Sequence, residues 1–228
     1  MREQAPTTLI TVFRGCSFFD LIIAIGSLPL RFRADLSCFP HRRSYLTPHP
    51  EKVDEWKKRV QSLPDGLRGG ISWKGGKDPR ARKMRSVVLE QWKDILLLKG
   101  ITFINLQYGE CKVEIMEAKE NLNAVIYDWT DADPLQDLDN FAAQIAALDL
   151  VISVDNATVH MAGALGVPVW TLLPYSPNWR WMLDREDTPW YPAMRLFRQP
   201  AFGDWETVMK TVSQELRKMK NDRFESQS

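Results

Sequence analysis

One segment, residues 149 to 173, constrains the fold more than any other part of the chain. It reads DLVISVDNATVHMAGALGVPVWTLL, with two apolar runs of strand type on either side of a stretch of small residues. Continuous apolar runs of this kind are typical of parallel strands that are covered on both faces. Gly166 and Pro168 end the helix predicted between the strands, because glycine favours a helix C-terminus and proline cannot continue the helix. The segment therefore predicts a strand-helix-strand unit of a parallel sheet.

The turn between the first strand and the helix carries four polar side chains. They are those of Asp155, Asn156, Thr158 and His160. Asp155 or Asn156 is a favoured N-cap, and the first backbone NH groups of a helix stabilise an anion. This pattern predicts a site for a phosphorylated ligand. In the alternative reading Asp155 is only a cap and His160 is a core or surface histidine, which is the commoner case for one isolated turn.

A second buried strand, predicted at residues 69 to 73, is followed by a basic loop. The loop reads KGGKDPRARKMRS and carries six Lys or Arg residues against a single Asp. Gly75 and Gly76 allow backbone conformations that other residues avoid, and clustered Lys and Arg can neutralise a diphosphate. A solvated charge run or a nucleic-acid contact would produce a similar loop. The net charge of +1 argues against nucleic acid, because the basic charge is local.

Strands and helices alternate along the rest of the chain. Further strands are predicted at residues 101 to 107, 124 to 127 and 194 to 198, and helices at 87 to 98, 112 to 120, 138 to 148 and 205 to 219. Alternation of this kind predicts an α/β protein with a doubly wound parallel sheet. The loop before the last strand carries Trp179, Trp181, Trp190 and Tyr191, which would form a sugar-stacking platform or, as is commoner for large aromatic side chains, pack into the core.

A long part of the chain resembles the C-terminal domain of bacterial glycosyltransferases related to family 9, the ADP-heptose:lipopolysaccharide heptosyltransferases. The resemblance is carried by VISVDNATVHMAGALGVPVW and the segment after it, and upstream by GISWKGG, FINLQYG and FAAQIAALDLVIS. It covers about residues 18 to 220, and it is greatest to the version found at the end of tetratricopeptide-repeat proteins. It implies the Rossmann-like C-terminal half of a GT-B fold. Such a domain takes a nucleotide-diphosphate sugar as donor, with a glycan, a lipid-linked glycan or a protein as acceptor.

The resemblance implies three catalytic residues. Asp155 would accept hydrogen bonds from hydroxyls of the donor sugar or order the loop. His160 would donate to the diphosphate, and Arg85 would offset phosphate charge as the glycosidic bond breaks.

It also implies a set of donor-binding residues in three loops. They are Lys74, Gly75 and Arg85 in the first loop, Gln107, Gly109 and Glu110 in the second, and Asn156, Ala157 and Thr158 in the third. The third set would turn backbone NH groups to the phosphates, and the second would lie near the nucleoside, with Glu110 reaching the ribose hydroxyls. Asn156, Ala157 and Lys74-Gly75-Gly76 replace the more usual Thr, Gly and Ala-Gly-Asn. No metal or other cofactor is implied.

Only 68 residues precede the strand at 69, fewer than a complete N-terminal GT-B domain needs. We expect residues 1 to 68 to be a partial N-terminal remnant and connector, and residues 69 to 228 to be the nucleotide-sugar-binding domain. The apolar run at residues 18 to 30 contains Asp20, is too short to span a bilayer and lacks signal-peptide features. It is predicted to be buried, with residues 31 to 50 as a connector.

Two functions remain open from the sequence. The chain is the donor-binding domain of a glycosyltransferase, with turnover doubtful because the acceptor side and the usual general base belong to the N-terminal domain, or it is a non-catalytic nucleotide-binding or scaffold remnant. A tetratricopeptide-repeat domain or an N-terminal domain would be its partner. Cys16, Cys38 and Cys111 show no CxxC or metal spacing and an odd count, which indicates a reduced, cytoplasmic setting.

Overall fold

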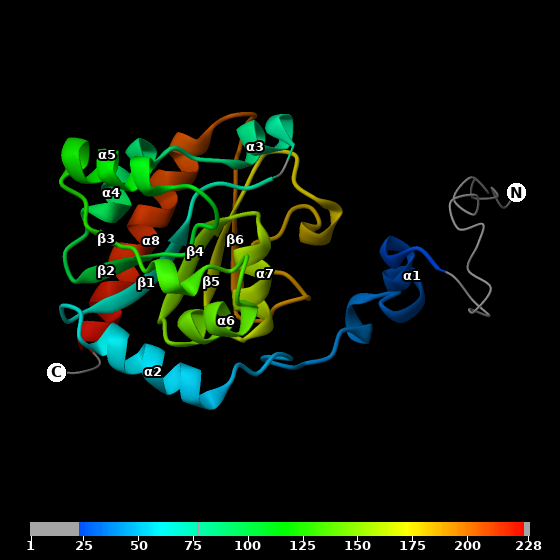
Figure 1. Cartoon of the computed structure of the whole chain (residues 1–228). Coiled ribbons are helices and arrows are strands. Elements are labelled where there is room, and N and C mark those ends of the chain that lie inside the picture. The colour runs from blue at the N-terminus through cyan, green and yellow to red at the C-terminus, as the bar shows by residue number, and fades with distance from the viewer. Residues whose placement is uncertain (1–22, 77, 226–228) are drawn as a thin grey trace, which may run out of the picture. The chain divides into compact units, whose positions relative to one another are not determined.

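The computed structural model describes residues 23–76 and 78–225 (Figure 1). The chain divides into two compact units, the first ending at Pro40 and the second beginning at His41. The division at residue 68 that the sequence suggested remains a prediction. Helix α2 (Pro50–Gln61), which lies before that division, packs against α6 (Leu138–Ala146) within the second unit.

The described part of the first unit consists of short helical turns. They are η2 (Ile25–Ser27), α1 (Leu28–Phe32) and η3 (Leu36–Cys38). The prediction that residues 18 to 30 are buried is wrong for residues 23 to 30, since Ile25 is 85% exposed and Leu30 is 78% exposed. Helices of three and five residues have too few side chains to enclose a core of their own. Residues 18 to 22 lie outside the described residues.

The second unit is built on one sheet of six parallel strands. In chain order they are β1 (Leu67–Ser72), β2 (Ile101–Asn105), β3 (Ile126–Tyr127), β4 (Leu150–Val154), β5 (Val169–Leu173) and β6 (Met194–Arg198). Their order in the sheet is β3-β2-β1-β4-β5-β6, and every pair of neighbours is parallel. The strand order therefore reverses between β1 and β4. This arrangement confirms the predicted doubly wound, Rossmann-like sheet.

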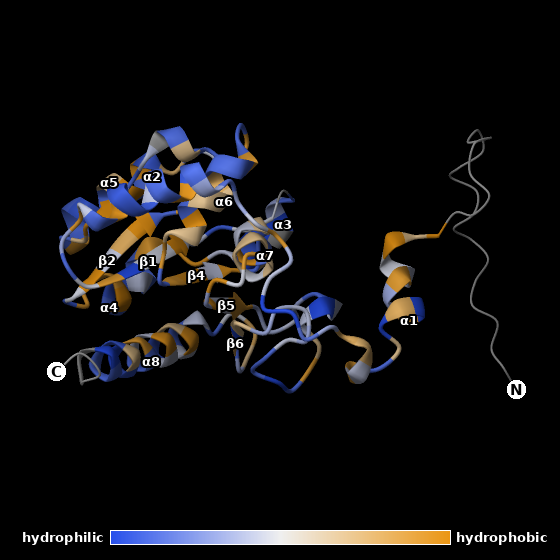
Figure 2. Ribbon diagram, turned by 90° about the horizontal axis from the view of Figure 1, so that it is seen from below, coloured by the Kyte–Doolittle hydropathy of each residue, from blue (hydrophilic) through white to orange (hydrophobic). Residues whose placement is uncertain are grey.

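Helices cover both faces of this sheet, as Figure 2 shows for α8 on one side and α6 and α7 on the other. Along β4, Ile152 packs with Val212 of α8 (Trp205–Glu225), whereas Val151 packs with Val159 of α7 (Ala157–Ala164). The first face also carries η4 (Leu89–Trp92), α4 (Lys93–Leu96) and α5 (Lys112–Leu122). Burial on both faces explains why every residue of β4 and β5 is buried and apolar or small.

Two segments differ from the prediction. The helix predicted at residues 87 to 98 is shorter and covers only η4 and α4, because Val88 is still extended and the NH of Val87 donates to the Trp73 carbonyl at 2.9 Å. The basic loop contains the helix α3 (Pro79–Arg85). Asp78 begins this helix by accepting a hydrogen bond from the Arg80 NH at 2.9 Å, and Pro79 is preset for the first helical position.

Candidate functional site

The two segments that the sequence singled out meet at the carboxyl ends of β1 and β4. Ligands of open α/β sheets bind where the strand order reverses, and this is that place. The loop after β1 comes so close to the turn after β4 that a Cβ atom on Gly75 would lie 2.8 Å from the carbonyl oxygen of Asp155. A residue other than glycine would have to push the two loops apart.

Asp155 is the buried acid of the site. It is 3% exposed, and among the described residues its Oδ2 atom has no hydrogen-bond partner. The nearest cation is the guanidinium of Arg85 at the end of α3, whose Nη1 lies 3.7 Å from Oδ2, close enough for an ion pair but too far for a hydrogen bond. Two of the three predicted catalytic residues are therefore adjacent. A buried carboxylate oxygen is costly without a donor, so this atom lacks a hydrogen bond that a ligand would supply once the loops around it move to expose it.

Asn156 is the N-cap of α7 and also a link between strands. Its Oδ1 accepts hydrogen bonds from the Thr158 NH at 2.9 Å and the Ser153 hydroxyl at 3.2 Å. Its Nδ2 donates to the Ser72 hydroxyl at 2.7 Å and the Lys74 carbonyl at 2.9 Å. The Thr158 side chain is buried, while Ala157 beside it is exposed.

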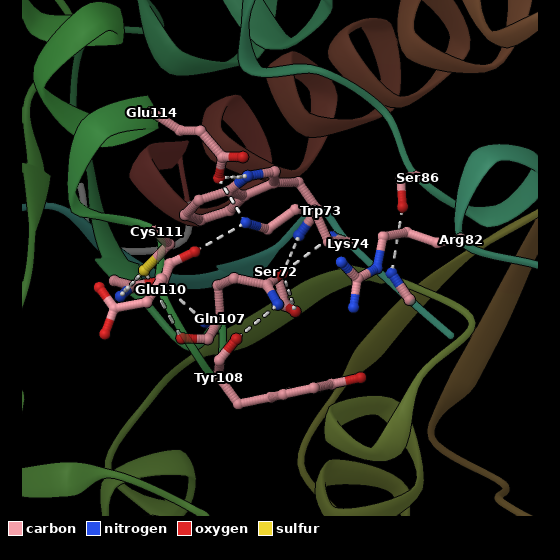
Figure 3. A network of polar contacts seen from close by, with 12 residues as sticks. Ser72, Trp73, Lys74, Arg82, Ser86, Gln107, Tyr108, Glu110, Cys111 and Glu114 are labelled. Carbon is pink, nitrogen blue, oxygen red and sulfur yellow. Dashed lines mark hydrogen bonds and ion pairs between the residues drawn. The ribbon is translucent and has the colours of Figure 1, made fainter. Parts of the chain in front are cut away.

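Gln107 fixes the start of the basic loop from the end of β2 (Figure 3). Its Oε1 accepts hydrogen bonds from the Ser72 hydroxyl at 3.0 Å and from the NH groups of Trp73 at 3.0 Å and Lys74 at 2.7 Å. Its Nε2 donates to the Tyr108 carbonyl at 3.0 Å. Both polar atoms of the side chain therefore have partners within the protein.

The ammonium group of Lys74 is paired with α5. Its Nζ lies 2.7 Å from Oε2 of Glu114 and donates to the carbonyl of Glu110 at 2.9 Å, and the indole NH of Trp73 donates to the same Glu114 oxygen. Figure 3 shows these side chains converging. The positive charge nearest Asp155 therefore comes from Arg85 of α3.

A cavity of about 350 Å³ opens beside this network, at the carboxyl ends of β2 and β3. Gly109 and Glu110, both predicted near a nucleoside, line it together with Tyr108, Trp129 and Asp128. Gly109 has φ +75 and open space around it, so it serves the turn rather than a close contact. The cavity has the size and the mixed apolar and polar lining of a small-ligand site.

His160 lies in the first turns of α7, on the side of the aromatic loop. Its ring stacks on Trp181 with 5.1 Å between centroids, and its Nδ1 lies 3.0 Å from the Tyr191 hydroxyl. Burial lowers the pKa of His160, and Asp155 partly offsets this effect. The imidazole is therefore neutral at neutral pH and held in one orientation.

The aromatic loop contains both buried and exposed aromatic side chains, so neither a sugar-stacking platform nor packing into the core describes all of them. Trp181 and Tyr191 are buried, Trp190 is half-buried, and Trp179 is 54% exposed. Sequence reasoning missed Ser72 and Glu114. A serine ending an apolar strand and a glutamate in an amphipathic helix carry no local signal, since their partners lie in other elements.

Within residues 23–76 and 78–225, no helix combines the length and the apolar character that crossing a membrane requires. The same residues bring no three His, Cys, Asp or Glu side chains together in a geometry that could hold a metal ion.

Comparison with known proteins finds one relative in sequence and several solved structures with a similar fold. No family model matches the chain. Protein FlbA of Caulobacter vibrioides is 39% identical over 212 residues, which make up 90% of this chain and 35% of FlbA. The chain thus spans about a third of the length of this relative.

Two solved structures of glycosyltransferases illustrate what the chain resembles. The ADP-heptose lipopolysaccharide heptosyltransferase II of E. coli gives a TM-score of 0.53 at 15% identity, covering 82% of this chain and 57% of that one. A family 9 glycosyl transferase from Veillonella parvula gives a TM-score of 0.47 at 18% identity, covering 69% and 43%. The first likeness confirms the predicted fold.

Proposed function

We propose that the chain is the donor-binding domain of a family 9-type glycosyltransferase and binds a nucleotide-diphosphate sugar where β1 and β4 end. The observation that carries the proposal is the Asp155 carboxylate, which is 3% exposed and has an Oδ2 atom without a hydrogen-bond partner, 3.7 Å from Arg85. A sugar hydroxyl would supply the donor that Oδ2 lacks, and a phosphate would be the counterion of Arg85. The fold shared with a heptosyltransferase supports the same class of function.

The proposed ligand extends from this pair in two directions. The diphosphate lies between Arg85 and the N-terminus of α7, where Ala157 is exposed and the helix dipole favours negative charge. The nucleoside would enter the cavity lined by Gly109 and Glu110, and the carboxylate of Glu110 would accept hydrogen bonds from ribose hydroxyls. Nδ1 of His160 faces Tyr191, so its Nε2 is the nitrogen proposed for the diphosphate.

In the proposed reaction an acceptor hydroxyl attacks the anomeric carbon and inverts it. The bond from that carbon to the diphosphate breaks, and the electron pair leaves with the phosphate oxygen. Arg85 and the α7 N-terminus stabilise the developing charge, so that catalysis comes from orientation and electrostatic support. The proton of the acceptor hydroxyl goes to a general base, which in a GT-B enzyme belongs to the other domain.

The second candidate is a non-catalytic nucleotide-binding or scaffold module. In that case the same strand ends would bind a nucleotide without transferring its sugar. The acceptor would be a glycan, a lipid-linked glycan or a protein, and a tetratricopeptide-repeat or N-terminal domain would be the partner. The buried thiol of Cys111, whose pKa is raised by burial, suits a reducing, cytoplasmic setting.

Titration calorimetry with ADP, UDP and GDP, and then with their sugar conjugates, tests the proposal. We expect the 228-residue chain to bind one of these series and, in a radiolabelled-donor assay with candidate acceptors, to show little or no transfer. A missing general base alone removes roughly two to four orders of magnitude in rate. Absence of binding to every nucleotide would refute the proposed donor site. Multiple-turnover transfer would instead direct the search for a base to Asp35 and Glu110, since Asp20 lies outside the described residues.

Arg85→Ala is expected to weaken binding of the nucleoside diphosphate about tenfold, because a charge-assisted hydrogen bond to phosphate is lost. The melting temperature should hardly change, since the side chain is partly exposed and contributes little to the core. Arg80→Ala, which removes the same charge from the same helix, is the control. Equal affinity of Arg85→Ala and wild type in calorimetry would contradict the role of Arg85.

His160→Ala and Asp155→Ala should differ in which ligand they affect. Loss of the histidine should weaken the free nucleotide and the nucleotide sugar alike, because both contain the diphosphate. Loss of Asp155 should weaken mainly the conjugate, because its carboxylate is proposed to accept from sugar hydroxyls. Calorimetry with both ligands decides the matter, and equal losses for both ligands in both variants would exclude this division of roles.

A further inference from the structure

Buried hydrogen bonds join the three loops of the proposed donor site into one unit. Ser72, the last residue of β1, lies at the centre and is 0% exposed. Its hydroxyl donates to Oε1 of Gln107 at 3.0 Å and accepts from Nδ2 of Asn156 at 2.7 Å. One hydroxyl therefore connects the end of β1 to the loop after β2 and to the turn after β4.

The connection continues into the backbone on either side of Ser72. Oε1 of Gln107 also accepts from the NH groups of Trp73 and Lys74, and Nδ2 of Asn156 donates to the Lys74 carbonyl at 2.9 Å. Both polar groups of the Lys74 peptide backbone are thus held by side chains from the neighbouring strands. Gly75 comes next and makes the close approach to Asp155.

Every polar side-chain atom of the network has a partner within the protein. Gln107 and Asn156 are each 7% exposed, and their amide oxygens and nitrogens all have partners within the protein. Ser72 cannot reach a ligand at all, because it is fully enclosed. Donors and acceptors aligned in one direction strengthen one another, so the loss of one member should loosen the others.

We infer that Ser72, Gln107 and Asn156 are positioning residues, whose side chains set the distance between the basic loop and Asp155 without touching the ligand. The inference rests on the proposed function, and it concerns the side chains of Gln107 and Asn156, while the backbone NH groups predicted to face the phosphates keep that role. Its consequence is that affinity depends on a serine that no ligand can contact.

Four variants test this inference, with two measurements on each. Ser72→Ala removes the central hydroxyl, and Gln107→Met keeps the length of the side chain but removes its acceptor. Gln107→Glu restores an acceptor oxygen for all three donors. Ser213→Ala is the matched control, because Ser213 is also buried and its hydroxyl donates to the Asp94 carbonyl at 3.1 Å, in a contact between α8 and α4.

The first measurement is hydrogen exchange of the backbone amides without any nucleotide. Exchange at Trp73 and Lys74, and at the turn formed by residues 155 to 158, is expected to accelerate in Ser72→Ala and Gln107→Met. Gln107→Glu should slow it again, and Ser213→Ala should leave it at the wild-type rate. Unchanged exchange in both loops of Gln107→Met would overturn the inference, whether or not the protein binds nucleotides.

The second measurement is affinity for ADP, UDP and GDP by calorimetry, well below the melting temperature. Ser72→Ala and Gln107→Met are expected to lose about tenfold in affinity, because a binding loop that is no longer held in place must be ordered by the ligand. Gln107→Glu should recover most of it. Ser213→Ala should lower the melting temperature as much as Ser72→Ala and bind like wild type. Wild-type affinity in Ser72→Ala would overturn the inference, whereas a wild type that binds no nucleotide would refute the proposed function and leave hydrogen exchange to decide the network.

Discussion

Gly75→Ala is expected to reduce the affinity for a nucleoside diphosphate by a factor of about one hundred. The new Cβ atom would lie 2.8 Å from the carbonyl oxygen of Asp155, a backbone atom that cannot turn away. The loop after β1 and the turn after β4 would separate, which moves Arg85 and the α7 N-terminus away from a common ligand. Titration calorimetry on the variant measures the effect.

Gly69→Ala is the matched control for this variant. It makes the same substitution in β1, but its Cβ atom would meet the Phe103 ring at 3.4 Å, an ordinary van der Waals contact. Nucleotide affinity of this control should be close to that of wild type. If Gly75→Ala bound as tightly as Gly69→Ala, the close approach of the two loops would have no part in binding.

Gly66→Ala is expected to have the largest effect on stability, about 3 kcal/mol in the free energy of unfolding. Gly66 has φ +137, a conformation that residues with a side chain rarely adopt, and a Cβ atom would lie 2.3 Å from the Gly100 carbonyl oxygen. That carbonyl accepts the hydrogen bond from the Leu67 NH with which β1 begins. For a domain of this size the melting temperature should fall by about 6 to 12 °C.

Gly109→Ala separates the two causes of this destabilisation. Gly109 also has a positive φ, +75, but no atom lies within 4 Å of its Cβ position. Its substitution should therefore show the cost of the backbone conformation alone, about 1 kcal/mol. Equal losses in the two variants, measured by chemical denaturation, would mean that the contact with Gly100 is relieved by local movement.

The sheet was predictable from the sequence because its strands are buried on both faces. β4 and β5 appear as unbroken apolar runs, and the turn between β4 and α7 carries its own N-cap in Asn156. Asp155 could be singled out because polar residues after buried strands gather at one edge of a parallel sheet, whereas Arg85 was distinguished from the other cations of its loop only by the resemblance to family 9. The strands, the N-cap and Asp155 are each encoded within a few neighbouring residues.

The rest of the site depends on partners that are distant in the sequence. Lys74 was grouped with the other cations of its loop, yet its ammonium pairs with Glu114 of α5. Gln107 and Asn156 were predicted to lie in the donor site, but the bonds of their side-chain amides to Ser72 and to the backbone of Lys74 could not be foreseen. These groups come together only in the packed sheet, so no pattern of neighbouring residues predicts their contacts. The helix α3 was also not predicted, but for this helix a local signal existed, since the Asp78-Pro79 pair marks its start.

The reversal of strand order between β1 and β4 also affects how this domain folds. Ser72 and Asn156, which join the two strands at their ends, lie 84 positions apart in the chain. Contacts of such long range require a large loop to close before they can be made, which slows folding. A folding intermediate that contained β1, β2 and β3 alone would have the cavity but not the acid, and one that contained β4 and β5 alone would have the acid but not its guanidinium. The binding site is therefore a property of the completed sheet, and a ligand held there stabilises the native state against every partly folded form.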